Sequence, residues 1–326
     1  MEQLDLTRIK RAADRLRPYA TRTPMLRSDR LDEITGAQVF LKSENLQRGG
    51  SFKFRGATNA IAAFSPEQRS RGVVCCSSGN HGIATALAAQ QFGIPATVVM
   101  PRDAPAIKRQ QVERAGAAVV GYDRVSDDRD VIAAELCAQS RASFIHPYDG
   151  LETMAGQGTV GLEIVEQLAA LDLSPDDMLI CCGGGGLTAG IATVLINVAP
   201  LCECWVVEPT GFDDYARSLD AGTRIGNTAR AGSICDALLA PMPGALTFAV
   251  NQPLLSGGFT VDDTAVLAAM AFAITELKVV LEPGGAIALA ALLSGEVEGN
   301  GQVICATLSG GNADAAMIQQ ALAHTP

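Results

Sequence analysis

Apolar segments without polar alternation recur along this sequence and constrain its fold more than any other feature. Between residues 72 and 147, the segments VVCCSS, ATVVMP and AAVVGY are separated by stretches of helical periodicity that begin near residues 80, 105 and 127. A strand with one solvent-exposed face alternates apolar and polar side chains, whereas an uninterrupted apolar run is typical of a parallel strand covered on both faces. The pattern therefore predicts an open parallel α/β sheet.

A second series of such segments starts near residue 150. It contains MLICC, ECWVVE and QVICATLS, expected helices over 153–170, 262–277 and 284–294, and a less regular stretch over 209–258. A chain of 326 residues is long enough for two lobes. Because ligands of open α/β sheets bind at the carboxyl ends of the strands, we expect two parallel sheets in two lobes with the site in the cleft between them.

The composition excludes several classes of protein. The formal net charge is −10 and no basic stripe occurs, so nucleic acid is not expected as a partner. The N-terminus has no signal-peptide core and the apolar runs are too short to cross a bilayer, so no membrane association is expected and the protein is interpreted as cytoplasmic. The nine cysteines form no C-x-x-C motif, which favours buried free thiols over disulfides or zinc ligands.

Three Gly-rich or polar turns follow predicted strands. They are SSGNHG (77–82), GGGGL (183–187) and SGGN (309–312). Four glycines in front of a helix let backbone N–H groups approach an anion, and a phosphate is the expected ligand. A tight turn without a ligand is the plainer alternative. If the three turns converge, they form one site.

A dinucleotide fingerprint competes for the same glycines. Gly184, Gly186 and Ala189 satisfy G-x-G-x-x-A, and Glu208 ends the next strand, where a ribose-binding acid would stand. A nicotinamide-dependent (NAD) oxidoreductase is therefore an alternative of another class. It gives no use to Lys53 or to the other two turns.

The turns at 77–82 and 309–312 carry polar side chains. Backbone N–H groups at the start of the helix after SSGNHG can hold a carboxylate, and Asn80 can reach a neighbouring acceptor. Ser309 is expected to project into the cleft, and Asn312 is expected to cap the final helix. Simple helix capping explains both turns equally well.

The nonapeptide GGSFKFRGA places Lys53 between Phe52 and Phe54. An apolar, desolvated setting disfavours the ammonium form and lowers the pKa of a lysine. A neutral lysine amine is what nucleophilic attack on a carbonyl group requires.

These motifs together resemble a known family. S-F-K-F-R-G-A, S-S-G-N-H-G, G-G-G-G-L, E-P-G-G-A (282–286) and L-S-G-G-N, in this order, are similar to the serine/threonine dehydratase and serine racemase branch of the fold-type II pyridoxal-phosphate (PLP) enzymes. The resemblance implies a tryptophan synthase β-like fold with the PLP site between two lobes. It also implies a larger PLP-binding domain of residues 1–66 and 148–326, and a smaller mobile domain of residues 67–147.

The resemblance also implies roles for single residues. Lys53 matches the lysine that forms the Schiff base, and Ser309 matches the hydroxyl that faces the ring nitrogen of pyridoxal 5'-phosphate. The implied cofactor-binding residues are Phe52, Lys53, Asn80, Gly183, Gly184, Gly185, Gly186, Leu187, Glu282 and Ser309. The implied substrate-binding residues are Ser77, Ser78, Gly79, Asn80 and His81.

A structural cation is a further implication of the resemblance. Glu208, the carbonyl of Phe212 and Asp214 match the spacing of a Mg or Ca site in the racemase-like branch, and oxygen ligands suit such ions. Solvated surface acids are the alternative interpretation. The resemblance further implies a homodimer or a homotetramer.

The expected function is that of a PLP-dependent dehydratase (ammonia-lyase). It would convert a β-hydroxy amino acid, L-threonine or L-serine, to a 2-oxo acid and ammonia, with Lys53 as base at Cα. Ser78 matches a second acid/base of the racemase-like branch, so serine racemase is an alternative, as is a dehydratase of 3-hydroxyaspartate or another hydroxy amino acid. A non-catalytic ligand-binding protein on this fold is a further alternative. The segment 235–244 departs from the relatives where they line the substrate pocket.

Overall fold

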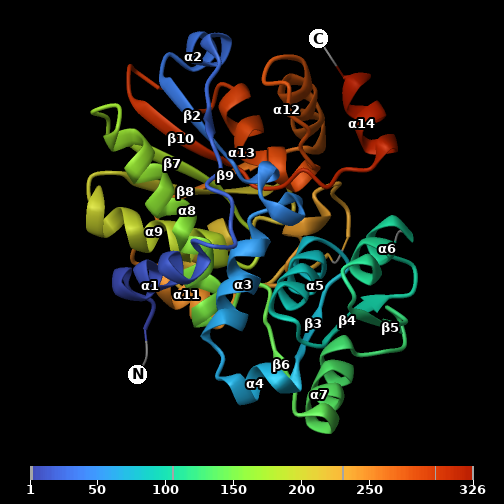
Figure 1. Cartoon of the computed structure of the whole chain (residues 1–326). Coiled ribbons are helices and arrows are strands. Elements are labelled where there is room, and N and C mark those ends of the chain that lie inside the picture. Colours follow the sequence, from blue (N-terminus) through green and yellow to red (C-terminus); the bar gives the residue numbers. More distant parts are fainter. Residues whose placement is uncertain (1–2, 105, 230, 298, 325–326) are drawn as a thin grey trace.

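The larger of two β-sheets contains strands from both ends of the chain. The computed structural model describes residues 3–104, 106–229, 231–297 and 299–324 (Figure 1). The strand order of this sheet is β1-β2-β10-β7-β8-β9, and only the β1–β2 pair is antiparallel. Its strands are β1 (Met25–Leu26), β2 (Gln38–Ser43), β7 (Asp177–Cys181), β8 (Glu203–Pro209), β9 (Gly257–Val261) and β10 (Val303–Leu308).

The smaller sheet is parallel throughout, with the order β5-β4-β3-β6. Its strands are β3 (Val73–Cys76), β4 (Ala96–Pro101), β5 (Ala118–Tyr122) and β6 (Ser143–Phe144). In β3, Val73 and Cys75 pack into one apolar cluster, and Val74 and Cys76 pack into another. Both faces of this strand are therefore covered, which explains its uninterrupted apolar sequence. The prediction of an α/β fold with two parallel-type sheets is confirmed.

Helices cover both sheets. Around the larger sheet, α13 packs along β7 to β10, while α9 packs on β7 from the opposite side beneath α8 (Figure 1). Around the smaller sheet, α5 packs against β3 and β4, and α7 packs against β3, β4 and β6. The α-helices are α1 (Leu6–Leu16), α2 (Asp29–Thr35), α3 (Lys53–Ala63), α4 (Pro66–Arg71), α5 (Asn80–Phe92), α6 (Ala106–Arg114), α7 (Arg129–Ser140), α8 (Leu151–Ala169), α9 (Gly186–Val198), α10 (Asp214–Ala221), α11 (Ala245–Asn251), α12 (Asp263–Thr275), α13 (Pro283–Leu293) and α14 (Ala315–Leu322).

The stretch over 209–258 is more regular than its sequence suggested. It contains α10, the short 3₁₀ helix η3 (Asp236–Leu238), α11 and the start of β9; two more 3₁₀ helices, η1 (Glu44–Leu46) and η2 (Arg48–Gly50), precede α3. Helix α3 itself was not expected from the sequence. Its inner turns are buried almost all round, so no helical periodicity marks them, and the helix is stabilised by packing against α5 and α8.

The two sheets divide the chain unequally. All strands of the smaller sheet lie between Val73 and Phe144, and the strands of the larger sheet lie outside that interval. We propose that the smaller sheet is the centre of the smaller domain over 67–147. No helix within the described part of the chain is long and apolar enough to cross a membrane. The nine cysteines, all within the described residues, are free thiols, as expected.

Candidate active site

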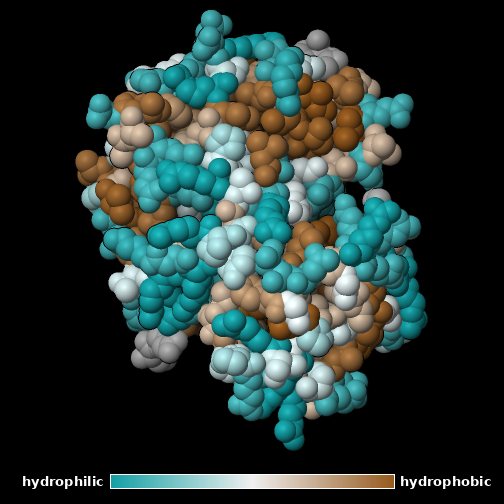
Figure 2. Space-filling model, viewed as in Figure 1, coloured by the Kyte–Doolittle hydropathy of each residue, from teal (hydrophilic) through white to brown (hydrophobic). Residues whose placement is uncertain are grey.

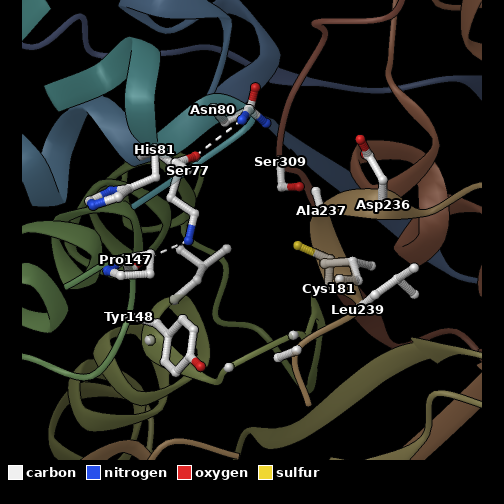
Figure 3. A pocket seen from close by; sticks show the side chains of 18 of the residues that line it. Ser77, Asn80, His81, Pro147, Tyr148, Cys181, Asp236, Ala237, Leu239 and Ser309 are labelled. Carbon is white, nitrogen blue, oxygen red and sulfur yellow. Dashed lines mark hydrogen bonds between the residues drawn. The ribbon is translucent and has the colours of Figure 1, made fainter. Parts of the chain in front are cut away.

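One cavity lies where strands of both sheets end. The loops after β3, β7 and β10 meet there, so the three Gly-rich or polar turns of the sequence converge (Figure 3). Every residue predicted to bind cofactor or substrate lines this cavity: Phe52, Lys53, Ser77, Ser78, Gly79, Asn80, His81, Gly183, Gly184, Gly185, Gly186, Leu187, Glu282 and Ser309. Their roles remain proposals, but their convergence is a finding.

Lys53 is the first residue of α3, and its amine is held at the cavity wall. The Nζ atom donates a hydrogen bond to the carbonyl of Pro147 at 2.9 Å and lies 5.0 Å from the centre of the Phe52 ring. Burial lowers the pKa of Lys53 to about 8, although Cys181 and Glu282 oppose this shift. A minor neutral fraction is therefore present at pH 7, far larger than for an exposed lysine, and the neutral amine is the state a nucleophile requires.

Phe54 does not share this setting. Its ring is fully buried in the cluster beside the smaller sheet, and the guanidinium of Arg48 lies 5.0 Å from the ring centre. Each residue of a helix is rotated by about 100° from the one before it, so Phe52 and Phe54, two positions apart, point in nearly opposite directions. Only one of the two can therefore face the cavity with Lys53. Phe52 is that residue, and the expectation that both rings surround the amine is wrong.

The loop from Ser77 to His81 presents the start of α5 to the cavity. The first N–H groups of a helix have no partner within it, so they are available to an anion such as a carboxylate. The His81 ring is fixed elsewhere, because Nε2 lies 2.9 Å from the carbonyl oxygen of Ile145. Burial lowers the pKa of His81 to about 3, so its imidazole is neutral and only its backbone can serve an anionic ligand.

Asn80 is held in one orientation by two neighbours. Its Nδ2 donates to Oε1 of Glu282, and its Oδ1 accepts from Nδ2 of Asn312 at 2.8 Å. Asn312 also donates to the carbonyl of Gly49 at 2.8 Å. The expectation that Asn312 caps the final helix is wrong, because Asp314 accepts from the Met317 N–H at the start of α14.

The glycine loop between β7 and α9 has the shape that a phosphate cradle needs. A Cβ at Gly184 would lie 2.3 Å from the Tyr148 ring. Gly185 has φ +88°, and a Cβ there would lie 2.3 Å from the Tyr215 hydroxyl. Any side chain at these two positions would clash with the surrounding residues, and at Gly185 it would also strain the backbone. The loop therefore fits the phosphate of the predicted cofactor.

Helix α11 holds the loop from behind. The Thr247 hydroxyl donates to the carbonyl of Gly184 at 2.6 Å, and Asn251 Nδ2 donates to the carbonyl of Gly185 at 3.1 Å. In a trans peptide the N–H points opposite to the C=O, so these bonds turn the following N–H groups away from α11. Neither side chain was found by sequence reasoning, because neither belongs to a motif.

Ser309 and Glu282 lie at the other side of the cavity. The Ser309 hydroxyl donates to the carbonyl of Gly284 at 3.4 Å and retains an acceptor site. Burial raises the pKa of Glu282 to about 7, while its hydrogen bond from Asn80 works in the opposite direction. Burial also raises the pKa of the neighbouring Cys181 thiol, which makes that thiol unreactive.

The three predicted metal ligands lie outside this cavity. Both Glu208 carboxylate oxygens accept backbone N–H groups of α10, from Tyr215 at 2.9 Å and Ala216 at 2.8 Å. Asp214 accepts from Asn227 at 2.6 Å through Oδ1, but its Oδ2 is buried without a hydrogen-bond partner. Glu208 and Asp214 are both fully buried, so solvated surface acids are excluded.

Burial raises the pKa of Asp214 to about 6 and that of Glu208 well above its ordinary value. An unsatisfied buried carboxylate oxygen fits a hard cation. However, no group of three or more His, Cys, Asp or Glu that could hold a metal occurs in the described ranges. A cation at this place therefore remains a proposal.

Two charged residues of the cavity, Lys108 and Arg129, escaped sequence reasoning. Lys108 and Arg129, from α6 and α7, line the cavity, as does Asp236 of η3 (Figure 3 labels Asp236). Neither Lys108 nor Arg129 belongs to a motif or to a turn predicted to bind a ligand, whereas Asp236 lies in the segment 235–244, which the resemblance placed at the substrate pocket. Only tertiary packing brings them to the cavity.

Two sheets with a cleft at their carboxyl ends, a buried lysine and a glycine-rich anion loop define a tryptophan synthase β-like PLP enzyme. Residues 16–310 match the family described as pyridoxal-phosphate dependent enzyme, and the chain belongs to this family. The family membership removes the ground for the nicotinamide alternative, and Glu208 lies outside the cavity.

The relatives of the chain include both lyases and racemases. An L-threo-3-hydroxyaspartate ammonia-lyase of Pseudomonas sp is 41% identical over 304 residues, which cover 93% of this chain and 94% of that protein. A serine racemase of Arabidopsis thaliana is 39% identical, with 95% and 93% covered. The solved maize serine racemase has a TM-score of 0.92 at 38% identity, with 99% and 98% covered, and a solved threonine deaminase of T.th. has 0.90 at 37%, with 95% and 99% covered.

Proposed function

We propose that this enzyme is an ammonia-lyase that converts a β-hydroxy amino acid to a 2-oxo acid and ammonia, with L-threonine and L-serine as the substrates expected from the sequence. The observation that carries the proposal is the Lys53 amine, which lies in the cavity lined by the glycine loop 183–187 and by the loop 77–81. Its lowered pKa of about 8 leaves this amine partly neutral. The threonine deaminase and the hydroxyaspartate ammonia-lyases among the relatives support this reaction class.

The residues divide the work of such a reaction. The glycine loop would hold the cofactor phosphate, and the N–H groups of the Ser77–His81 loop would hold the substrate α-carboxylate. Lys53 would accept the proton from Cα. The bound cofactor supplies an electron-withdrawing ring conjugated to Cα. The Ser309 hydroxyl would turn its one proton from the Gly284 carbonyl to the ring nitrogen, and this neutral donor favours loss of the β-hydroxyl over prolonged storage of charge on the ring.

Replacing Lys53 tests this proposal. Lys53→Ala should abolish ammonia release from L-serine, L-threonine and 3-hydroxyaspartate, and should abolish covalent labelling by PLP after borohydride reduction. Lys10→Ala, at an exposed site on α1, is the matched control and should change neither readout. Retention of both readouts in the Lys53 variant would exclude the proposed role of this residue.

Serine racemase is the second candidate function. Ser78 lies in the loop from Ser77 to His81 and lines the cavity. Serine racemases are also among the relatives of the chain. If Ser78 acts as acid/base on the second face of Cα, Ser78→Ala should abolish D-serine formation and leave ammonia release intact. Chiral chromatography of the remaining serine measures this directly. Absence of D-serine from the unmodified enzyme would exclude racemisation.

A further inference from the structure

Two cationic side chains that have no role in the proposed chemistry line the cavity. Lys108 and Arg129 both come from helices around the smaller sheet. The charge of Lys108 is already compensated, because its Nζ lies 3.0 Å from Oδ2 of Asp236 on the opposite side of the cavity. Within the described residues, Arg129 has no comparable partner there.

The guanidinium of Arg129 is available to a ligand. Within the described ranges it forms one ion pair, with its neighbour Asp130 at 3.8 Å, and both side chains are largely exposed, at 49% and 75%. Such a pair contributes little. The adjacent Asp128 is occupied differently, because its carboxylate accepts the backbone N–H groups of Asp130 and Val131 as the cap of α7. An added anion would therefore meet little competition.

Tyr148 lines the same cavity. Its ring packs edge-on against His146, with centroids 4.6 Å apart and planes at 88°, which fixes its direction (Figure 3 labels Tyr148). Burial raises the pKa of the Tyr148 phenol, and Arg129 is the strongest charge opposing this rise. The phenol is therefore a donor near a guanidinium that can only donate.

We propose that Arg129 and Tyr148 form a subsite for a carboxylate on Cβ of the substrate, so that the preferred substrate is a β-hydroxy amino acid with an aspartate skeleton. This inference rests on the proposed function and names its substrate class. Guanidinium groups bind carboxylates with two parallel hydrogen bonds, and a phenol adds a third donor. The methyl group of threonine or the hydrogen of serine would leave these donors without a partner.

The reaction balances without any further reagent. The C–H bond at Cα and the C–O bond at Cβ break, the proton passes to Lys53, and the hydroxyl leaves as water. Hydrolysis of the resulting C–N bond takes up one water, so the products of 3-hydroxyaspartate are oxaloacetate and ammonia. No net oxidation or reduction occurs.

Kinetics of the cofactor-loaded enzyme on three substrates test the subsite. L-threo-3-hydroxyaspartate should have a higher kcat/KM than L-serine and L-threonine. Arg129→Gln should raise KM for hydroxyaspartate about tenfold or more, as expected for the loss of hydrogen bonds to a charged group, and change KM for L-serine less than about twofold. Arg129→Lys should restore part of the loss. Arg124→Gln, which removes an exposed cation paired with Asp103, is the control and should change neither KM.

Calorimetry gives a readout that does not depend on turnover. Succinate has the carbon skeleton and both carboxylates of hydroxyaspartate, and butyrate has only one carboxylate. Succinate should bind the unmodified holoenzyme more tightly than butyrate, and Arg129→Gln should remove this preference.

The outcomes separate the two proposals. Equal losses of Arg129→Gln on L-serine and hydroxyaspartate, or turnover of L-serine without turnover of hydroxyaspartate, would overturn the subsite and leave the proposed function standing. If no hydroxy amino acid releases ammonia, the proposed function fails, and the succinate titration alone decides on the subsite.

Discussion

Burial acts on the ionisable residues of the cavity in opposite directions. It lowers the pKa of Lys53 to about 8 and of His81 to about 3, and it raises the pKa of Glu282 to about 7. In each case the cavity disfavours the charged form, because the low dielectric removes the solvation of a charge. The Lys53 amine therefore loses its proton more readily than an exposed lysine does, and the His81 imidazole is uncharged.

Glu282 predicts a pH dependence of stability for the cofactor-free protein. Its pKa in the folded state, about 7, lies above its ordinary value of 4.5. The protonated form is therefore the one that folding favours, so this contribution is fully present below about pH 4.5 and is lost as the pH rises through about 7. The loss is about 3 kcal/mol at most.

Glu282→Gln keeps the shape and removes the charge. Its urea midpoint minus that of the unmodified protein should increase from about pH 5 to about pH 8. The reason is that the unmodified protein must bury an ionised carboxylate at the higher pH and the variant does not. Glu296→Gln, at an exposed position, should follow the unmodified protein at both pH values. A constant difference between the Glu282 variant and the unmodified protein would contradict the assignment.

Asp214 predicts a response to divalent cations. We propose that Ca²⁺ or Mg²⁺ binds Glu208, the Phe212 carbonyl and Asp214, since Oδ2 of Asp214 is buried without a partner. Saturating cation should raise the melting temperature, by an amount equivalent to about 2.7 kcal/mol at a hundredfold excess over Kd. Asp214→Asn should abolish this rise and the exposed Asp220→Asn should not; equal responses would exclude the site.

At the scale of elements, the loop from Gly183 to Leu187 depends on a helix that comes about 60 residues later in the sequence. Helix α11 fixes two carbonyls of the loop through Thr247 and Asn251. Asn251 also donates to the Tyr215 hydroxyl at 2.7 Å, and that hydroxyl lies against Gly185. These hydrogen bonds hold the loop in one shape without a ligand.

Removing one of these donors should weaken cofactor binding. Thr247→Val deletes the hydroxyl and leaves the Gly184 carbonyl with only the longer hydrogen bond from the Gly244 N–H, at 3.3 Å, which should raise the Kd for PLP about tenfold. Thr247→Ser keeps the hydroxyl and should bind PLP nearly as the unmodified protein does. Fluorescence titration of the cofactor-free variants measures both values. Equal affinities of the Val and Ser variants would show that the hydroxyl does not position the loop.

A network of buried charges fixes α3 and therefore the position of Lys53. Arg55, two residues further along the helix, lies 2.8 Å from Glu44 and 2.6 Å from Glu163, and Lys42 also lies 2.6 Å from Glu163. These charges are paired and hydrogen-bonded, as buried charges must be. The start of α3 thus has a defined rotation that points Lys53 and not Phe54 into the cavity.

At the scale of the whole molecule, the cavity lies between the parts of the chain built on the two sheets. An ion pair at 3.0 Å crosses it, from Lys108 of α6 beside the smaller sheet to Asp236 of η3. The space-filling view shows apolar side chains gathered over α12 (Figure 2). Val280, which follows α12, is 41% exposed. Large exposed apolar areas mark interaction surfaces more often than free surface.

We propose that this enzyme is a homodimer or a homotetramer. Light scattering coupled to gel filtration should give two or four times the chain mass of 33.9 kDa. The measurement should be repeated at several protein concentrations, because a weak dimer dissociates on dilution. A mass of one chain at every concentration would contradict this prediction.

The sequence by itself determined the parallel α/β architecture and the three Gly-rich or polar turns that line the cavity. Uninterrupted apolar strands, glycine runs and helix starts are local features, so their physics can be read from neighbouring residues. The resemblance to a known family added the roles implied for Lys53 and Ser309. Only the tertiary structure decided that Phe54 turns away from the cavity, that Asn312 orients Asn80, and that Arg129 and Thr247 reach the site. These placements depend on the rotation of whole helices against distant partners, which no local pattern records.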